Sequence, residues 1–256
     1  MSQKNVHQWF DSSLGQYLIE HEHRYFDQVV VNIFGYNAVQ IGWPQFNFLN
    51  LNRMPLHFSV DLVDQASLRA AADYLPIQSS SVDLVILPHV LEFNTNPHQI
   101  LREVHRILIP EGHIVISGFN PLSLWGACHY LKSTRGEFPW NGNFIALSRL
   151  KDWLKLLDFE MAGGRLSCYT PPFKQERWRR RFSFMEAAGD RWWPISGGVY
   201  FLHAIKHMHG MRIIKPGWKN CIETKKRMVP ATKKLTKSLM MDSHQNFIQK
   251  IDLNKR

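Results

Sequence analysis

Short apolar runs alternate with amphipathic segments along most of the chain, and this alternation constrains the fold more than any other feature of the sequence. The runs predicted to be strands are 37–42, 56–61, 68–73, 81–87, 112–117, 159–169 and 198–206. Apolar residues at helical spacing predict helices between several of them, and residues 1–34 also have a helical, amphipathic pattern. Strands that alternate with helices are typical of a parallel sheet covered on both faces.

Local signals place two of the helices more closely. Asn96 is a good N-cap and Pro97 suits the first helical turn, so one helix is predicted to begin there and to end at Pro110-Glu111-Gly112. Arg149–Leu157 has a second amphipathic pattern. Only a loop or short helix separates the last two strands, so the last strand is expected to be antiparallel. The predicted fold class is α/β, a three-layer sandwich around a seven-stranded, mostly parallel sheet.

The charge of the chain is unevenly distributed. The net charge is +10, but residues 215–256 hold 11 of the 31 Lys and Arg residues and only 3 of the 21 Asp and Glu residues. We therefore predict one domain over residues 1–210, with a substrate-side insertion at 170–196, followed by a basic tail over 211–256. Three distant cysteines, no apolar leader pattern and no run long enough to span a membrane favour a reducing, cytoplasmic location.

Two stretches carry a family resemblance. They are LPIQSSSVDLVILPHVLEF (75–93) and LREVHRILIPEGHIVISGFNP (101–121). Their segments around strands four and five, with similar spacing, resemble the class I S-adenosylmethionine-dependent methyltransferases, specifically the UbiE/BioC-like methyltransferase domain, type 11. The resemblance implies a Rossmann-like fold, S-adenosylmethionine as the cofactor and methyl transfer as the reaction.

The predicted cofactor site lies at the carboxyl ends of the strands, where ligands bind in open parallel sheets. Gly42 follows the first strand and allows close backbone approach. The resemblance implies that Asp61 binds the ribose hydroxyls, that Asp73 binds the adenine amino group and that Tyr74 packs near the base. Asp61 and the nearby Asp64 could equally be helix N-caps.

Two further residues are candidates for catalysis. The resemblance places His89 near the methionine part of the cofactor, where it could act as a general base for a protonated acceptor. A hydrogen-bonded structural histidine is the alternative. Asn120 could hold the acceptor by hydrogen bonds, or it could form an Asn-Pro turn.

The first motif departs from the family pattern. The family has an acid followed by a glycine-rich loop, whereas this chain has Gln40 and a single glycine, Gly42, followed by Trp43 and Pro44. Pro44 removes a backbone donor and some flexibility. The cradle for the amino acid end of the cofactor is therefore expected to be altered or absent.

Other polar clusters have less specific interpretations. His21-Glu22-His23 is read as solvated helix residues, and no metal site is predicted. KQERWRRR (174–181) could contact an anionic substrate or form a solvated helix face.

Three functions remain open. The first is methyl transfer to a small-molecule or lipid-like acceptor. The second is an RNA-directed methyltransferase, in which the basic insertion and tail contact nucleic acid or another anionic surface. The third is a catalytically inactive binding or scaffold protein that keeps the methyltransferase fold.

Overall fold

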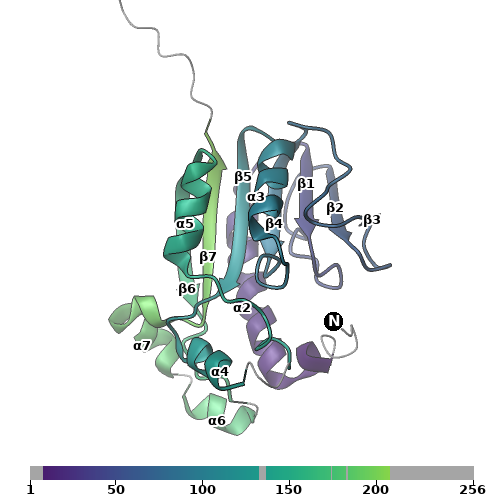
Figure 1. Ribbon diagram of the computed structural model, residues 1–256. Helices are drawn as coiled ribbons and strands as arrows, with labels where there is room; N and C mark the ends of the chain where they lie inside the picture. Colours follow the sequence, from purple (N-terminus) through teal and green to yellow (C-terminus); the bar gives the residue numbers. More distant parts are fainter. Residues whose placement is uncertain (1–7, 133–136, 174, 183, 208–256) are drawn as a thin grey trace, which may run out of the picture. The chain divides into compact units, whose positions relative to one another are not determined.

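The computed structural model describes residues 8–132, 137–173, 175–182 and 184–207. Seven strands form one sheet in the order β3-β2-β1-β4-β5-β7-β6 (Figure 1). The strands are β1 (Asn37–Ile41), β2 (Leu56–Asp61), β3 (Leu68–Arg69), β4 (Val82–Pro88), β5 (Leu108–Phe119), β6 (Phe159–Ser167) and β7 (Val199–Lys206). All neighbours are parallel except β7, which is antiparallel to both β5 and β6. The predicted fold class is confirmed.

Helices cover both faces of this sheet. Helix α2 (Ser13–Val30) lies on one face, and α3 (Pro97–Ile107) and α5 (Leu147–Leu156) lie on the other (Figure 1). Two hydrophobic clusters fill the spaces between the layers, one containing the apolar side of α2 and the other containing those of α3 and α5. The burial of both strand faces explains why β4 reads as a continuous apolar run.

A cap of short helices lies beside the carboxyl ends of the parallel strands, next to the first turns of α2 (Figure 1). It consists of α4 (Leu124–Lys132), α6 (Glu176–Arg181), α7 (Phe184–Trp192) and the 3₁₀ turn η2 (Pro194–Ser196). Ligands bind at this end of open α/β sheets, so the cap stands where it can cover a site.

The connection from β1 to β2 contains no helix. Parallel strands are usually joined through one, but residues 42–55 consist of turns and extended chain. This loop takes the place of a helix, and its Phe48 and Leu49 side chains are buried in the same hydrophobic cluster as the apolar side of α2.

Most element boundaries lie within two residues of those predicted, but two segments differ more. The expected third strand at 68–73 is only Leu68–Arg69. Helix α3 ends at Ile107, and Pro110-Glu111-Gly112 lies inside β5 rather than in a separate turn. Glu111 has a φ of 61° there, and the register shifts so that Val82 pairs with Leu108 but Leu84 with His113. Pro110-Glu111-Gly112 thus forms a bulge within β5 instead of a turn before it.

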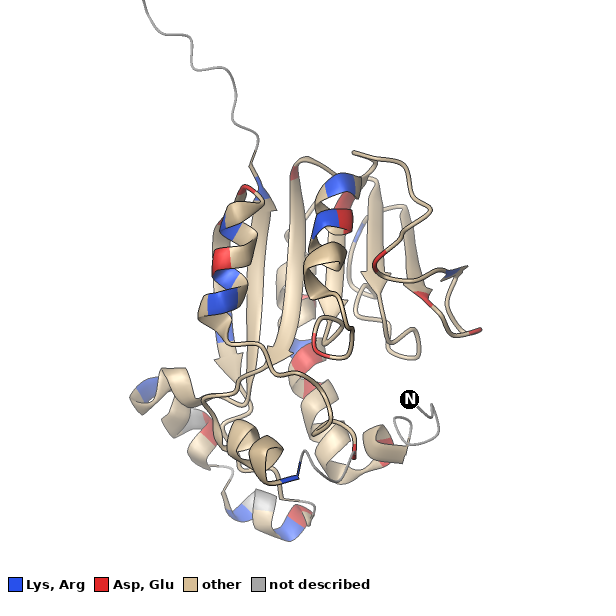
Figure 2. Ribbon diagram, in the orientation of Figure 1, with Lys and Arg blue, Asp and Glu red and all other residues tan. Residues whose placement is uncertain are grey.

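Lys and Arg positions occur mainly on the outer helices α3, α5 and α6, whereas the strands carry few charges (Figure 2). Among the described residues, no helix is long and apolar enough to cross a membrane. The predicted basic tail, 211–256, lies outside the described residues.

Candidate functional site

A cleft opens at the carboxyl ends of β1, β2 and β4. It holds about 170 Å³ and is lined by Gly42, Trp43, Asp61, His89, Val90 and Phe138, among others. Gly42 has a φ of 82°, and a Cβ at this position would lie 2.7 Å from Cγ2 of Val90. Only glycine fits there, because a side chain would meet both backbone strain and a steric clash.

The two candidate acids near β2 have different surroundings. The Asp61 carboxylate borders the cleft, where Oδ2 accepts from the Trp43 N–H at 3.2 Å and Oδ1 from the Leu62 N–H at 2.6 Å. Asp64 is exposed, and its carboxylate lies 3.0 Å from Nη1 of Arg69. Asp61 is therefore the acid that a ligand in the cleft would meet.

Asp73 and Tyr74 lie beside the cleft rather than in its lining. Ala70 and Ala72 line it from the same segment. Tyr74 is 80% exposed, and the half-buried Asp73 carboxylate makes no hydrogen bond to a described residue. A ligand that extends past Ala72 would find this carboxylate available as an acceptor.

Gln40 determines the shape of the loop after β1. Its side chain is 2% exposed, and Nε2 donates to the carbonyl oxygens of Gly42, Trp43 and Phe46 at 3.1, 3.0 and 2.7 Å. Its Oε1 accepts from the Phe48 N–H at 3.0 Å. A carboxylate in this position could accept but could not donate, so the loop that this chain has requires an amide here.

His89 lies between two buried carboxylates. Its Nδ1 is 2.7 Å from Oε2 of Glu92, and its Nε2 is 2.9 Å from Oε1 of Glu22 on α2. Glu22 and His89 are 0% exposed and Glu92 is 2% exposed. Burial alone would lower the pKa of His89, but the two carboxylates raise it to about 9. Burial raises the pKa of Glu92, and His89 opposes that shift.

Backbone and hydroxyl donors complete this cluster. Glu22 Oε1 also accepts from the Ser117 hydroxyl at 2.7 Å, and Glu92 Oε1 accepts from the Phe119 N–H. The Trp43 indole stacks on His89 with ring centroids 5.3 Å apart. The buried cluster of Glu22, His89 and Glu92 therefore lies against Trp43, which lines the cleft.

The interpretation of His21-Glu22-His23 as solvated residues is wrong. Glu22 is fully buried, and the side chain of His21 is 9% exposed. A signal for Glu22 was present, since it continues the i, i+4 series of Leu14, Leu18 and Phe26, all buried. Among the described residues, no group of His, Cys, Asp or Glu side chains is arranged to hold a metal ion.

Asn120 joins the end of β5 to the cap. Its Nδ2 donates to the carbonyl oxygens of Ile195 and Gly197 at 2.8 and 3.0 Å, and its Oδ1 accepts from the Leu122 N–H at 3.0 Å. It is 4% exposed and does not line the cleft. Both ends of the amide are thus engaged within the protein.

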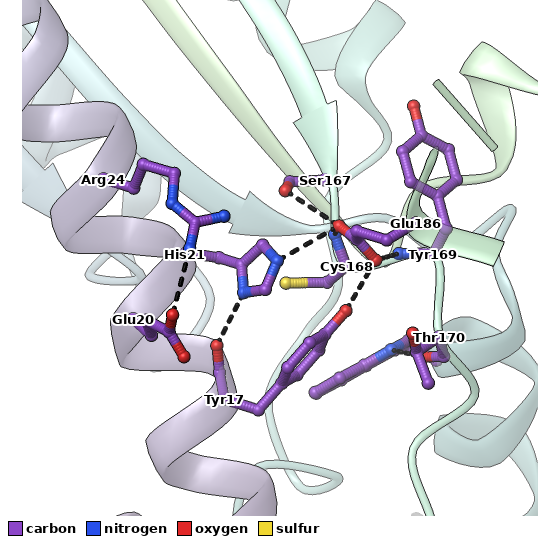
Figure 3. A network of polar contacts seen from close by, with 10 residues as sticks. Tyr17, Glu20, His21, Arg24, Ser167, Cys168, Tyr169, Thr170 and Glu186 are labelled. Carbon is purple, nitrogen blue, oxygen red and sulfur yellow. Dashed lines mark hydrogen bonds and ion pairs between the residues drawn. The ribbon is translucent and has the colours of Figure 1, made fainter. Parts of the chain in front are cut away.

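Glu186 attaches the cap helix α7 to the sheet (Figure 3). Its carboxylate accepts from the Tyr17 hydroxyl at 2.7 Å and from the backbone N–H groups of Cys168 and Tyr169 at 2.9 and 3.0 Å. His21 Nε2 lies 3.2 Å from Oε1. Burial alone would raise the pKa of Glu186, but the contacts with His21 and Tyr17 lower it to about 2.

The sheet order, the antiparallel β7 and a cleft at the carboxyl ends of β1, β2 and β4 define the class I methyltransferase fold. Solved structures agree. A possible histamine N-methyltransferase from Thermotoga maritima has a TM-score of 0.56 and 16% identity, over 79% of this chain and 95% of that one. A SAM-dependent methyltransferase from Archaeoglobus fulgidus has a TM-score of 0.56 and 17% identity, over 80% of this chain and 100% of that one.

Sequence comparisons point to the same class. Residues 49–116 match the methyltransferase domain family. The uncharacterized protein YafS of Escherichia coli is 44% identical over 88 residues, which are 34% of this chain and 37% of that protein. The match thus spans little more than a third of that relative. In its fold and over residues 49–116, the chain is therefore similar to the class I S-adenosylmethionine-dependent methyltransferases.

Proposed function

We propose that the protein transfers a methyl group from S-adenosylmethionine to a small-molecule or lipid-like acceptor. The observation that carries the proposal is the cleft at the carboxyl ends of β1, β2 and β4, which Gly42 lines with backbone and Asp61 with a carboxylate. Asp73 adds a second carboxylate without a hydrogen bond to a described residue. These groups fit the hydroxyl and amino donors of a nucleoside.

Each residue has a proposed part in binding. Gly42 allows close approach to the backbone, Asp61 accepts from the ribose hydroxyls, and Asp73 accepts from the adenine amino group, with Tyr74 beside the base. When bound, S-adenosylmethionine would supply an electrophilic methyl group to the acceptor. The protein contributes alignment and exclusion of water.

For His89 and Asn120 we propose positioning roles. A pKa of about 9 keeps His89 protonated near neutral pH, so its ring cannot accept a proton from an acceptor. Glu22 and Glu92 fix the His89 ring, which supports a role for this ring in positioning the stacked Trp43 side chain at the cleft. Asn120 holds the end of β5 against the cap.

Calorimetric titration of the full chain with S-adenosylhomocysteine tests the proposal. We expect micromolar binding, weakened at least about tenfold by Asp73→Asn, because the charged acceptor becomes a neutral amide oxygen and its hydrogen bond is weakened. This variant removes no hydrogen bond to a described residue of the free protein. Asp64→Asn is the matched control, since Asp64 is an exposed acid nearby, and its affinity should equal that of the wild type.

The cleft's size favours a second candidate function, a methyltransferase-fold binding protein without catalysis. Its 170 Å³ is below the roughly 300–1,000 Å³ of most ligand pockets, and the side chains of Trp43 and Phe138 border it. Absence of binding at millimolar cofactor, by a protein with a cooperative unfolding transition, would overturn the enzyme proposal and support this one.

A further inference from the structure

A larger cavity lies next to the cofactor cleft. It holds about 370 Å³ and is bordered by residues from separate segments of the chain. Trp9 and Leu14 come from the start of the N-terminal helical region, Lys132 ends α4, and Phe138 and Trp140 follow it. This volume is within the range of small-molecule sites, unlike that of the cleft.

One side chain borders both spaces. Phe138 lines the cavity and also the cofactor cleft. Its ring centroid lies 5.2 Å from that of Trp9 on the cavity side and 6.2 Å from that of Trp43, which borders the cleft. The cavity and the cleft therefore meet at Phe138.

Three aromatic side chains border the cavity, beside the polar Gln8 and Ser12. The aromatic residues are Trp9, Phe138 and Trp140, and Leu14 and Pro172 are the other apolar lining residues. Phe138 and Trp140 are 7% and 2% exposed, so their positions are fixed by packing before a ligand arrives. Rigid aromatic walls favour a flat aromatic ligand through offset stacking and edge contacts.

The cavity has one half-buried charge. Lys132 Nζ lies 5.1 Å from the centroid of the Trp140 ring, and no described carboxylate lies within ion-pair distance of it. Glu137 also borders the cavity, but it is exposed and makes an interaction of its own. A cation at an apolar wall attracts an anionic group on the ligand.

We propose that this cavity binds the methyl acceptor and that the acceptor is an aromatic carboxylic acid, with its ring among Trp9, Phe138 and Trp140 and its carboxylate at Lys132. This acceptor assignment rests on the proposed methyl transfer. The preference for an aromatic anion rests only on the cavity itself.

The test compares 2-naphthoate with 2-naphthamide, which has similar shape but no charge, by calorimetric titration of the full chain. We expect the acid to bind at least about tenfold more tightly, since a charge-assisted contact forms only with the anion. Lys132→Met should abolish this preference and Lys132→Arg should retain it. Lys151→Met, at an exposed lysine on α5, is the control and should behave as the wild type. Equal affinities for acid and amide in the wild type, or an undiminished preference in Lys132→Met, would overturn the proposal.

A second titration separates this proposal from the cofactor proposal. Because Phe138 borders both sites, the affinity for 2-naphthoate should differ by at least about threefold between cofactor-free protein and protein saturated with S-adenosylhomocysteine. If S-adenosylhomocysteine binds but the affinity for 2-naphthoate is the same with and without it, the acceptor assignment is overturned. If S-adenosylhomocysteine does not bind but the acid preference depends on Lys132, the proposed methyl transfer fails and the aromatic-anion site stands.

Discussion

Gln40→Glu would restore the acid that the family pattern has near the end of the first strand, yet the structure predicts that it destabilises this protein. Glutamate has nearly the shape of glutamine and keeps the oxygen that accepts from the Phe48 N–H. It loses both amide hydrogens, which now serve the carbonyl oxygens of Gly42, Trp43 and Phe46. It also directs a buried negative charge at the negative ends of three carbonyl dipoles.

The cost can be worked from these contacts. An amide has two N–H groups, so at least two carbonyl oxygens lose their donor, at about 1–3 kcal/mol for each group left unsatisfied. Trp43 and Phe46 are only half-buried, so water replaces part of the loss. We expect a decrease in the free energy of unfolding of about 2–4 kcal/mol at pH 8. Burial raises the pKa of the introduced carboxyl in the folded state, so its neutral form costs less and the decrease should be smaller at pH 5.

Urea unfolding followed by tryptophan fluorescence at pH 5 and pH 8 measures both effects. Gln65→Glu is the control, because it makes the same chemical change at an exposed position of the β2–β3 connection. The reasoning is refuted if Gln40→Glu stays within about 0.5 kcal/mol of the wild type at pH 8, the range of ordinary surface substitutions. Tighter binding of S-adenosylhomocysteine by this variant would refute it as well.

Three further predictions concern the same site and its cap. Gly42→Ala should lower the free energy of unfolding by about 1–3 kcal/mol in urea titrations and abolish calorimetric S-adenosylhomocysteine binding, whereas Gly163→Ala, with nothing within 4 Å of the added Cβ, should do neither. The pKa of His89 is raised to about 9, so its contribution to stability is complete below about pH 6.5 and is lost as the pH rises to 9. The free energy of unfolding should therefore fall between pH 6.5 and pH 9. Glu22→Gln should make this fall smaller, because it removes one of the two carboxylates that raise the pKa. Glu186→Gln should speed proteolytic cleavage within 170–196, since the carboxylate that attaches α7 becomes a weaker acceptor; an unchanged cleavage rate would contradict this role.

The sheet was predictable because its signals are local. Apolar runs bounded by polar residues placed most of the strands, and β2 has the bounds that the sequence indicated. The segment 68–73 was overestimated, because its alanines fit a strand only weakly and only two residues pair with β2. The bulge at Glu111 also escaped prediction, since a Pro-Glu-Gly turn signal does not distinguish a strand break from a strand irregularity.

The candidate site was predictable only in part, because several of its contacts are distant in sequence. The positions of Gly42 and Asp61 at strand ends followed from the pattern of strands. The contact between Glu22 and His89 did not, since it joins α2 to the end of β4 across the packed core. Glu186 likewise meets Tyr17 across 169 residues of chain. The donor role of Gln40 depends on carbonyl directions in a loop whose conformation no sequence pattern specifies.

The amide of Gln40 also limits how this protein could have diverged from relatives with an acid at that position. A loop that turns its N–H groups inward suits an acid, whereas the loop over residues 42–48 turns carbonyl oxygens inward and needs a donor. An acid at position 40 with the present loop would place carboxylate oxygens against carbonyl oxygens. An amide with a loop of inward N–H groups would place an N–H group against other N–H groups. Position 40 and the loop should therefore have been exchanged together, and related sequences should show an amide with the Trp-Pro loop and an acid with the glycine-rich one, with few mixed forms.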